Sequence, residues 1–268
     1  MMPGLVLRTV TATRYVTPLR EGGSLPALVE ADDDGLYVVK LRGAGQGPKA
    51  LAAEIVAGEL ARALELPVPE LVMVELDPQL AGAEPDAEIQ ELLAASAGLN
   101  VGLDFLPGAL PYAPARPPDA ELAADVVWFD ALVLNVDRTP RNPNLLRWHG
   151  RTWLIDHGAA LYVHHGGGDV IARAGDPFGP IADHVLLPHA GSLVEADARL
   201  SGRLDGSALR EIVALVPAEW MGGAPYAEHL AHRLAPPRTW VQAAEAARAA
   251  AGAANASVRD EEVDRGRA

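Results

Sequence analysis

Three polar side chains in one short stretch of the chain have the types and the spacing that phosphoryl transfer uses. Asp137 precedes Asn142 by five residues in a segment that reads as a loop, and Asp156 follows at the end of a run of β-branched and aromatic residues. Kinase-type sites use this order of groups, in which the first carboxylate orients the attacking hydroxyl and the other two groups bind metal. The stretch therefore predicts a catalytic base at Asp137 and Mg²⁺ ligands at Asn142 and Asp156.

A predicted β-hairpin explains how the two metal ligands come together. A two-residue turn at 149–150 separates two runs with the alternation of strands. Counted outward from that turn, Asn144 faces Ile155, so Asn142 and Asp156 are expected to meet at the open end of the hairpin. Opposed strand residues lie roughly 4.5–5.5 Å apart between Cα atoms, and two oxygen ligands so close suit a hard cation such as Mg²⁺. The alternative is a plain turn, since aspartate and asparagine beside prolines are ordinary turn formers.

A lysine upstream supplies the other half of such a site. Residues 36–42 (LYVVKLR) alternate like a strand, which places Lys40 on one face. Apolar residues at three- and four-residue steps predict a helix over 49–66. Glu54 in this helix is expected to pair with Lys40, which then positions the nucleotide phosphates. Two alternatives stay open: Glu59 as the helix partner, and an edge-strand lysine that only discourages aggregation.

Glycines between the first two predicted strands form the expected phosphate loop. Gly22, Gly23 and Ser24 lie in the loop within residues 14–30. Glycines there allow backbone N–H groups to approach a phosphate closely, and successive N–H groups form an anion-binding nest. A plain hairpin turn explains the two glycines equally well. A second glycine-rich segment, 43–47, follows the lysine strand and is the alternative phosphate loop.

The charge and the cysteine content of the chain exclude several classes of partner and of site. Its 268 residues carry a formal net charge of −14, with a pI near 4.9, which argues against nucleic acid or an anionic membrane as a partner. The chain has no cysteine, so disulfides, thiol chemistry and cysteine-ligated zinc are excluded. It has no signal-peptide pattern and no apolar run of about 18 residues or more, so a cytoplasmic protein without a membrane partner is expected.

The periodicities along the chain predict an α+β protein of two parts. Residues 1–106 are expected to form a small sheet-rich N-lobe with the phosphate loop, the lysine strand and a hinge. Residues 107–254 are expected to form a mainly helical C-lobe with the catalytic and metal loops, and 255–268 a disordered tail. The remaining elements are a strand at 67–76, helices at 86–97, 120–134, 205–215, 226–234 and 241–253, and a proline-rich linker at 112–119.

Four segments carry a family resemblance. They are VVKL at 38–41, AEIVAGELARALELPVPE at 53–70, NVDRTPRN at 135–142 and LIDHG at 154–158. With these segments the chain resembles the HipA-like kinases, the toxin-type serine/threonine kinases of bacteria that are related to the phosphatidylinositol kinases. The resemblance implies a two-lobed protein-kinase-like fold. It also implies ATP- and Mg²⁺-dependent transfer of the γ-phosphate to a protein serine or threonine hydroxyl.

The resemblance also implies roles by position. Asp137 becomes the catalytic base, Asn142 and Asp156 the Mg²⁺ ligands, and Lys40 the phosphate anchor. Ser24 becomes the counterpart of a serine that family members autophosphorylate.

The segment 102–106 becomes the hinge that holds adenine, with contacts expected from Asp104, Phe105 and Leu106. Two other functions stay open: a small-molecule or lipid kinase on the same fold, and a non-catalytic nucleotide-binding module that regulates a protein partner. The sequence does not identify the acceptor or that partner.

Overall fold

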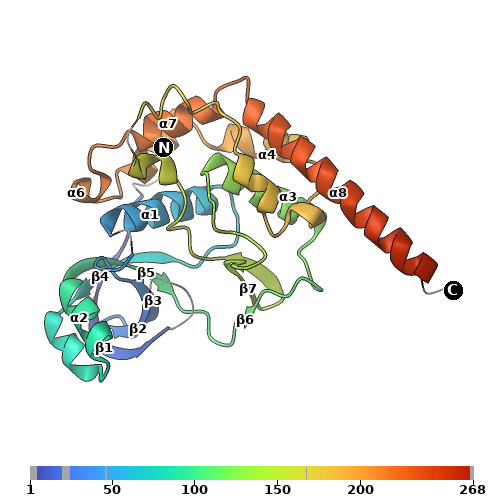
Figure 1. Ribbon diagram of the computed structural model, residues 1–268. Helices are drawn as coiled ribbons and strands as arrows, with labels where there is room; N and C mark the ends of the chain where they lie inside the picture. Colours follow the sequence, from blue (N-terminus) through green and yellow to red (C-terminus); the bar gives the residue numbers. More distant parts are fainter. Residues whose placement is uncertain (1–4, 20–24, 46, 167, 266–268) are drawn as a thin grey trace.

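The computed structural model of the protein describes residues 5–19, 25–45, 47–166 and 168–265. The N-terminal part is a closed barrel in which the strands follow the order β1-β2-β3-β5-β4 (Figure 1). Its strands are β1 (Thr9–Pro18), β2 (Ala27–Ala31), β3 (Leu36–Lys40), β4 (Leu71–Leu76) and β5 (Gly98–Asp104). All neighbouring pairs are antiparallel except β1 and β4, whose parallel pairing closes the barrel.

Strand β4 contributes to two hydrophobic cores. Val72 and Val74 belong to one cluster with Tyr37, while Leu71 and Met73 belong to a larger cluster that includes the helices. Successive strand residues point to opposite faces, so the barrel fills its interior and still offers an apolar outer face.

Helix α1 (Pro48–Ala63) packs on that outer face and is buried along most of its length. It begins after Gly47, whose φ of 68° favours glycine. It ends three residues before the predicted end at Leu66. Because α1 lies between the barrel and the other helices, even its acidic side chain Glu54 is buried.

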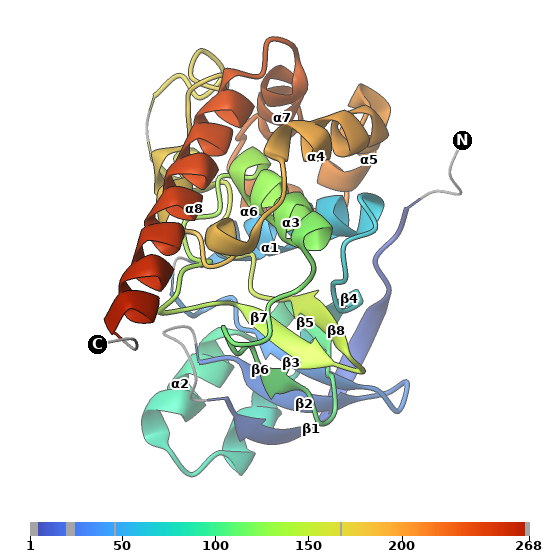
Figure 2. The same ribbon diagram turned by 90° about the vertical axis from the view of Figure 1, so that its right-hand side faces the viewer.

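A small sheet lies between the barrel and the helices (Figure 2). It consists of β6 (Leu110–Pro111), β7 (Leu145–Trp148) and β8 (Arg151–Leu154). Trp148 pairs with Arg151, and the N–H of Ile155 donates to the carbonyl of Asn144 at 3.1 Å. The predicted hairpin and its register are therefore confirmed.

The remaining helices surround α3 (Ala120–Leu132), which is central and apolar. The helices α4 to α8 share its core, whereas α2 and the 3₁₀ helix η1 pack on the barrel. Their bounds are α2 (Ala87–Ala95), η1 (Pro78–Ala83), α4 (Leu193–Leu200), α5 (Gly206–Val213), α6 (Ala218–Met221), α7 (Tyr226–Leu234) and α8 (Thr239–Arg265). Short 3₁₀ turns complete the described chain: η2 (Tyr162–His165), η3 (Gly179–Asp183), η4 (Leu187–His189) and η5 (Ser201–Arg203).

The C-terminal end differs from the prediction. A disordered tail was expected over 255–268, but the backbone of α8 is helical as far as Arg265. The segment after Gly252 contains neither glycine until Gly266 nor any proline, and it is rich in residues that tolerate a helix. Within the described ranges, no helix has the length and apolar character needed to cross a membrane.

Candidate active site

Lys40 joins two acidic side chains from distant parts of the chain. Its Nζ lies 2.9 Å from Glu54 Oε2 on α1 and also forms an ion pair with Asp156 Oδ1, just after β8. Strand alternation explains its direction, because Tyr37 and Val39 point into the barrel core while Lys40 points out of it. The Lys40–Glu54 contact expected from the sequence is present.

The other helix acid is not the partner of Lys40. Glu59 Oε1 lies 3.2 Å from the Nε of Arg62, one turn further along α1. The choice of Glu54 over Glu59 therefore agrees with the observed ion pairs.

Both groups of the Lys40–Glu54 pair remain charged at neutral pH. Burial alone would raise the pKa of Glu54, but the charge of Lys40 and the contacts from His157 lower this pKa to about 2. Burial likewise opposes the charged form of Lys40, and the carboxylates of Glu54 and Asp156 outweigh it, so the pKa of Lys40 is raised. The pair supplies a fixed cation whose side chain is 12% exposed.

Glu54 also fixes the turn that carries Asp156. The backbone N–H of His157 donates to Glu54 Oε2 at 2.8 Å, and the His157 ring packs edge-on against Phe129 with ring centroids 5.8 Å apart. His157 was not among the predicted site residues. The signal in the sequence was its position directly after Asp156, because the backbone of the next residue takes part in the turn that carries Asp156.

Asp137 is held by side-chain amides. Its Oδ2 accepts from Asn142 Nδ2 at 2.8 Å and from Asn144 Nδ2 at 3.3 Å, and its N–H donates to Asn135 Oδ1 at 3.1 Å. Two predicted site residues, Asp137 and Asn142, are thus in direct contact. Asn144 was not among the predicted site residues and served only to count the hairpin register. Its hydrogen bond to Asp137 was therefore not predicted.

Asn142 and Asp156 both lie at the open end of the hairpin, but they have different partners. Asn142 bonds Asp137 and Asp156 bonds Lys40; within the described ranges no hydrogen bond joins them directly. Since Asn142 uses its Nδ2, its Oδ1 remains available as an oxygen ligand, and so does Asp156 Oδ2. Two hard oxygen donors suit Mg²⁺ when phosphate oxygens and waters complete the shell. In the described part of the chain no three histidine or acidic side chains form a metal site by themselves.

A buried polar cluster supports the loop that carries Asp137. Asp130 on α3 is 0% exposed and accepts from three side chains: Asn135 Nδ2 at 3.0 Å, Arg138 Nε at 2.6 Å and His184 Nε2 at 2.8 Å. His184 Nδ1 accepts from the N–H of Leu186, which leaves the proton on Nε2. This cluster was not predicted from the sequence, although an aspartate among the apolar residues VVWFDAL at 126–132 was a visible signal.

Arg138 transmits this support to the hairpin. Its guanidinium donates to the backbone carbonyls of Asn144 and Ile155, the residues that close the hairpin at its open end. Burial would raise the pKa of Asp130, but Arg138 and His184 hold it well below its usual range. Burial lowers the pKa of His184 despite the adjacent carboxylate, so His184 is neutral at physiological pH.

The backbone turns sharply on both sides of the site. Asn144 and Asp156 have φ values of 48° and 57°, in the left-handed region that short polar side chains tolerate. Leu134 and Leu161 have φ values of 55° and 54°, which is unusual for leucine and costs on the order of 1–3 kcal/mol each. Burial of both leucines in the core holds them in place.

The predicted hinge follows β5. The N–H of Phe105 already donates to the carbonyl of Leu36 at 2.9 Å, so it is not free for an adenine base. Asp104 is exposed at the strand end, and Leu106 is buried. The predicted phosphate loop, formed by Gly22, Gly23 and Ser24, lies outside the described residues.

Comparison with solved structures shows a kinase-like fold. The Helicobacter pylori proinflammatory kinase CtkA is similar over 90% of this chain and 98% of that chain, with a TM-score of 0.53 and 12% identity. The Golgi casein kinase with Mn/ADP bound is similar over 89% of this chain and 73% of that chain, with a TM-score of 0.53 and 13% identity. A further structure of the Golgi casein kinase gives a TM-score of 0.51. Identities this low show the fold alone, which is a mixed α and β kinase fold.

The family follows from the sequence itself. None of the curated proteins compared with the chain matches it. A family model described as HipA-like kinase, however, matches residues 13–172, which is more than half of the chain and includes the lysine strand, α1 and the hairpin. The chain therefore belongs to the HipA-like kinase family.

Proposed function

We propose that this kinase transfers the γ-phosphate of ATP, with Mg²⁺, to a serine or threonine hydroxyl of a protein. The observation that carries the proposal is the ion-pair chain from Glu54 through Lys40 to Asp156. It brings together a cation suited to anchoring phosphate and a carboxylate suited to binding a metal ion. Phosphoryl transfer relies on such positioning and charge neutralisation more than on covalent work by the protein.

Nucleotide and metal would occupy the space around Lys40 and Asp156. The fold is shared with a kinase crystallised with Mn/ADP, which supports a nucleotide and a divalent cation here. Asn142 Oδ1 and Asp156 Oδ2 would hold the Mg²⁺, which neutralises phosphate charge when bound. Lys40 would then contact the phosphates while Glu54 keeps it in position. The contributions of Gly22, Gly23 and Ser24, and of Asp104, Phe105 and Leu106 as the hinge, belong to the same proposal.

Asp137 would act as the base. Its Oδ2 is engaged by Asn142 and Asn144, whereas its Oδ1 makes no hydrogen bond within the described residues. That oxygen can accept the proton of the acceptor hydroxyl while the hydroxyl oxygen forms its bond to the γ-phosphorus and the bond to the ADP oxygen breaks. A protein acceptor is supported by the name of one structural relative, the casein kinase.

The proposal includes a division into two lobes. The barrel with α1 would form the N-lobe over 1–106, and the helices the C-lobe over 107–254. The hairpin lies between them, so the nucleotide would bind where Lys40 from the barrel approaches Asp156 from the hairpin.

One experiment tests the proposed reaction. The pure protein is incubated with γ-labelled ATP, Mg²⁺ and protein acceptors, and the labelled residue is mapped by mass spectrometry. Asp137→Asn should bind ATP·Mg²⁺ almost normally and transfer phosphate about 10²–10⁴ times more slowly. The matched control is Asp34→Asn, at an exposed turn where φ is 63° and asparagine is tolerated.

Two outcomes would replace the proposal. Labelling of metabolites or lipids but of no protein would identify a small-molecule kinase. Nucleotide binding without any transfer by the wild type would identify a regulatory nucleotide-binding module.

A further inference from the structure

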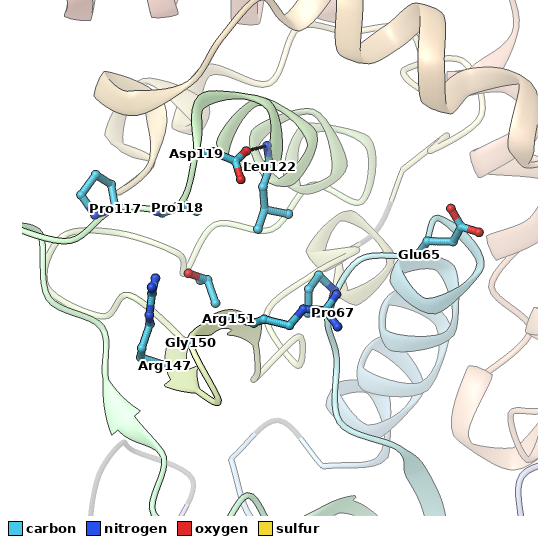
Figure 3. A pocket seen from close by; sticks show the side chains of 10 residues that line it. Glu65, Pro67, Pro117, Pro118, Asp119, Leu122, Arg147, Gly150 and Arg151 are labelled. Carbon is cyan, nitrogen blue, oxygen red and sulfur yellow. Dashed lines mark hydrogen bonds between the residues drawn. The ribbon is translucent and has the colours of Figure 1, made fainter.

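A pocket lies at the turn of the hairpin, at the end opposite to the one near Asp137. It has a volume of about 370 Å³ and is bounded by Pro67, Pro117 and Leu122, with Arg147 and Arg151 on the hairpin side. Figure 3 shows both arginines rising from the hairpin, with Arg147 on the side of Pro117 and Arg151 extending toward Pro67. The two guanidinium groups therefore flank the pocket instead of converging on one point.

These arginines have no partners. Within the described ranges, the side chains of Arg147 and Arg151 form no hydrogen bond or ion pair. Most other described arginines do pair with a carboxylate or donate to carbonyls, as expected in a chain of net charge −14. Two arginines without a side-chain partner that line the same pocket are therefore unusual for this molecule.

The acidic side chains at the pocket are already engaged. Glu65 pairs with Arg203 at 2.8 Å, and Asp119 accepts from the N–H of Leu122 at 2.8 Å as the cap of α3. Neither acidic side chain forms an ion pair with Arg147 or Arg151. Arginine binds carboxylates through paired hydrogen bonds, and such charge-assisted contacts are stronger than neutral ones.

The pocket is separate from the reacting groups. Arg151 is the first residue of β8, and five steps along the chain, at up to roughly 3.3 Å each, lead from it to Asp156, a span of up to about 16 Å. A ligand at the hairpin turn would therefore leave the space around Lys40 and Asp137 open.

We infer that this pocket binds an extended acidic segment of a partner protein. Carboxylates spaced along the segment would meet Arg147 and Arg151 at the two sides, and an apolar side chain would pack against Pro67, Pro117 and Leu122. Because the two guanidinium groups lie on different sides of the pocket, spaced carboxylates of an extended chain fit them better than a single compact anion. The inference does not depend on the proposed phosphoryl transfer, because its test measures binding alone.

The test uses fluorescence anisotropy with a labelled peptide in which glutamates alternate with leucines, added to the full-length protein. The wild type should bind this peptide and not its lysine counterpart, and added salt should weaken the binding. Arg147→Glu with Arg151→Glu should weaken it by about tenfold or more. The matched control is Arg210→Glu, since Arg210 is an exposed arginine without a side-chain partner that does not line the pocket. This control should change binding less than about twofold.

Three results would overturn the inference. They are no binding of the glutamate peptide, an equal loss in Arg210→Glu, and displacement of the peptide by an equal concentration of inorganic phosphate. The first removes the acidic segment as the occupant, the second indicates binding to overall charge, and the third indicates a site for a single anion. A circular-dichroism spectrum of the double variant that matches the wild type ensures that a loss of binding reflects the pocket and not the fold.

Discussion

The molecule contains two ionic clusters of similar chemistry in different surroundings. In the first, Lys40 pairs with Glu54 and Asp156, and the Asp156 side chain is 37% exposed. In the second, Asp130 pairs with Arg138 and His184, and all three are almost fully buried. The first cluster can exchange partners with ligands from solvent, whereas the second cannot.

The difference in burial suits the first cluster to binding ligands and the second cluster to stabilising the fold. A partly exposed carboxylate such as Asp156 can leave Lys40 and bind a cation at little cost, because water replaces the lost contact. A buried carboxylate such as Asp130 has no such replacement, since an unpaired charge in the interior is strongly unfavourable. We therefore expect substitutions in the first cluster to affect catalysis and those in the second to affect stability.

The largest expected effect is on catalysis. Asp156→Asn removes the charge that we propose binds the metal, and it should lower the rate of phosphate transfer by about 10³-fold, equivalent to several kcal/mol of transition-state stabilisation. Lys40 keeps Glu54 as its partner, so the free energy of unfolding should fall by about 1 kcal/mol or less. Initial rates with labelled ATP and urea denaturation measure the two effects. An unchanged rate would exclude Asp156 from the site.

The next effect is on stability. Asp130→Asn leaves the guanidinium of Arg138 buried without a counter-charge, and the free energy of unfolding should fall by about 3–5 kcal/mol. Asp125→Asn on the same helix is the matched control, because Asp125 pairs with Arg199 nearer the surface. Urea denaturation of both variants compares them. Equal losses would show that burial does not distinguish the two pairs.

A third effect appears on acidification. The pKa of Glu54 is about 2 in the folded protein, against an ordinary value of 4.5. The unfolded chain therefore takes up a proton first, and the stability from this group is present above about pH 5 and lost as the pH falls toward 2. The shift corresponds to about 3 kcal/mol. Urea denaturation over this pH range should give a flatter curve for Glu54→Gln than for the wild type, and parallel curves would contradict the assignment.

The sequence predicted the first cluster better than the second for a physical reason. Lys40, Glu54 and Asp156 each belong to a local pattern, a strand, a helix or a hairpin, and their order along the chain is the order that kinase sites use. Asp130 depends on His184, a partner that no local pattern connects to it. Only the presence of an acid in an apolar helix pointed to it.

The fold, too, could be predicted from the sequence only where local patterns determine it. Individual strands and the hairpin follow local periodicity, but the parallel pairing of Thr9 with Met73 that helps close the barrel joins distant segments. Helix α4 was missed even though Ser192 caps it by accepting from the N–H of Glu195, in a serine-x-x-glutamate pattern that marks a helix start. The first omission follows from non-local pairing, and the second from an unused local signal.

The smallest effect is expected for an ion pair that is exposed to solvent, which contrasts with the buried cluster of Asp130. Arg173 and Asp176, three residues apart in the chain, form an ion pair of 3.1 Å with side chains 78% and 54% exposed. Water solvates both charges before and after the pair breaks, so Arg173→Ala should change the free energy of unfolding by less than about 0.5 kcal/mol. Urea denaturation at low and high salt measures this change. A loss above about 1 kcal/mol would mean that this fold stabilises ion pairs regardless of burial. The buried position of Asp130 would then no longer explain why its cluster supports the structure while that of Asp156 is free for chemistry.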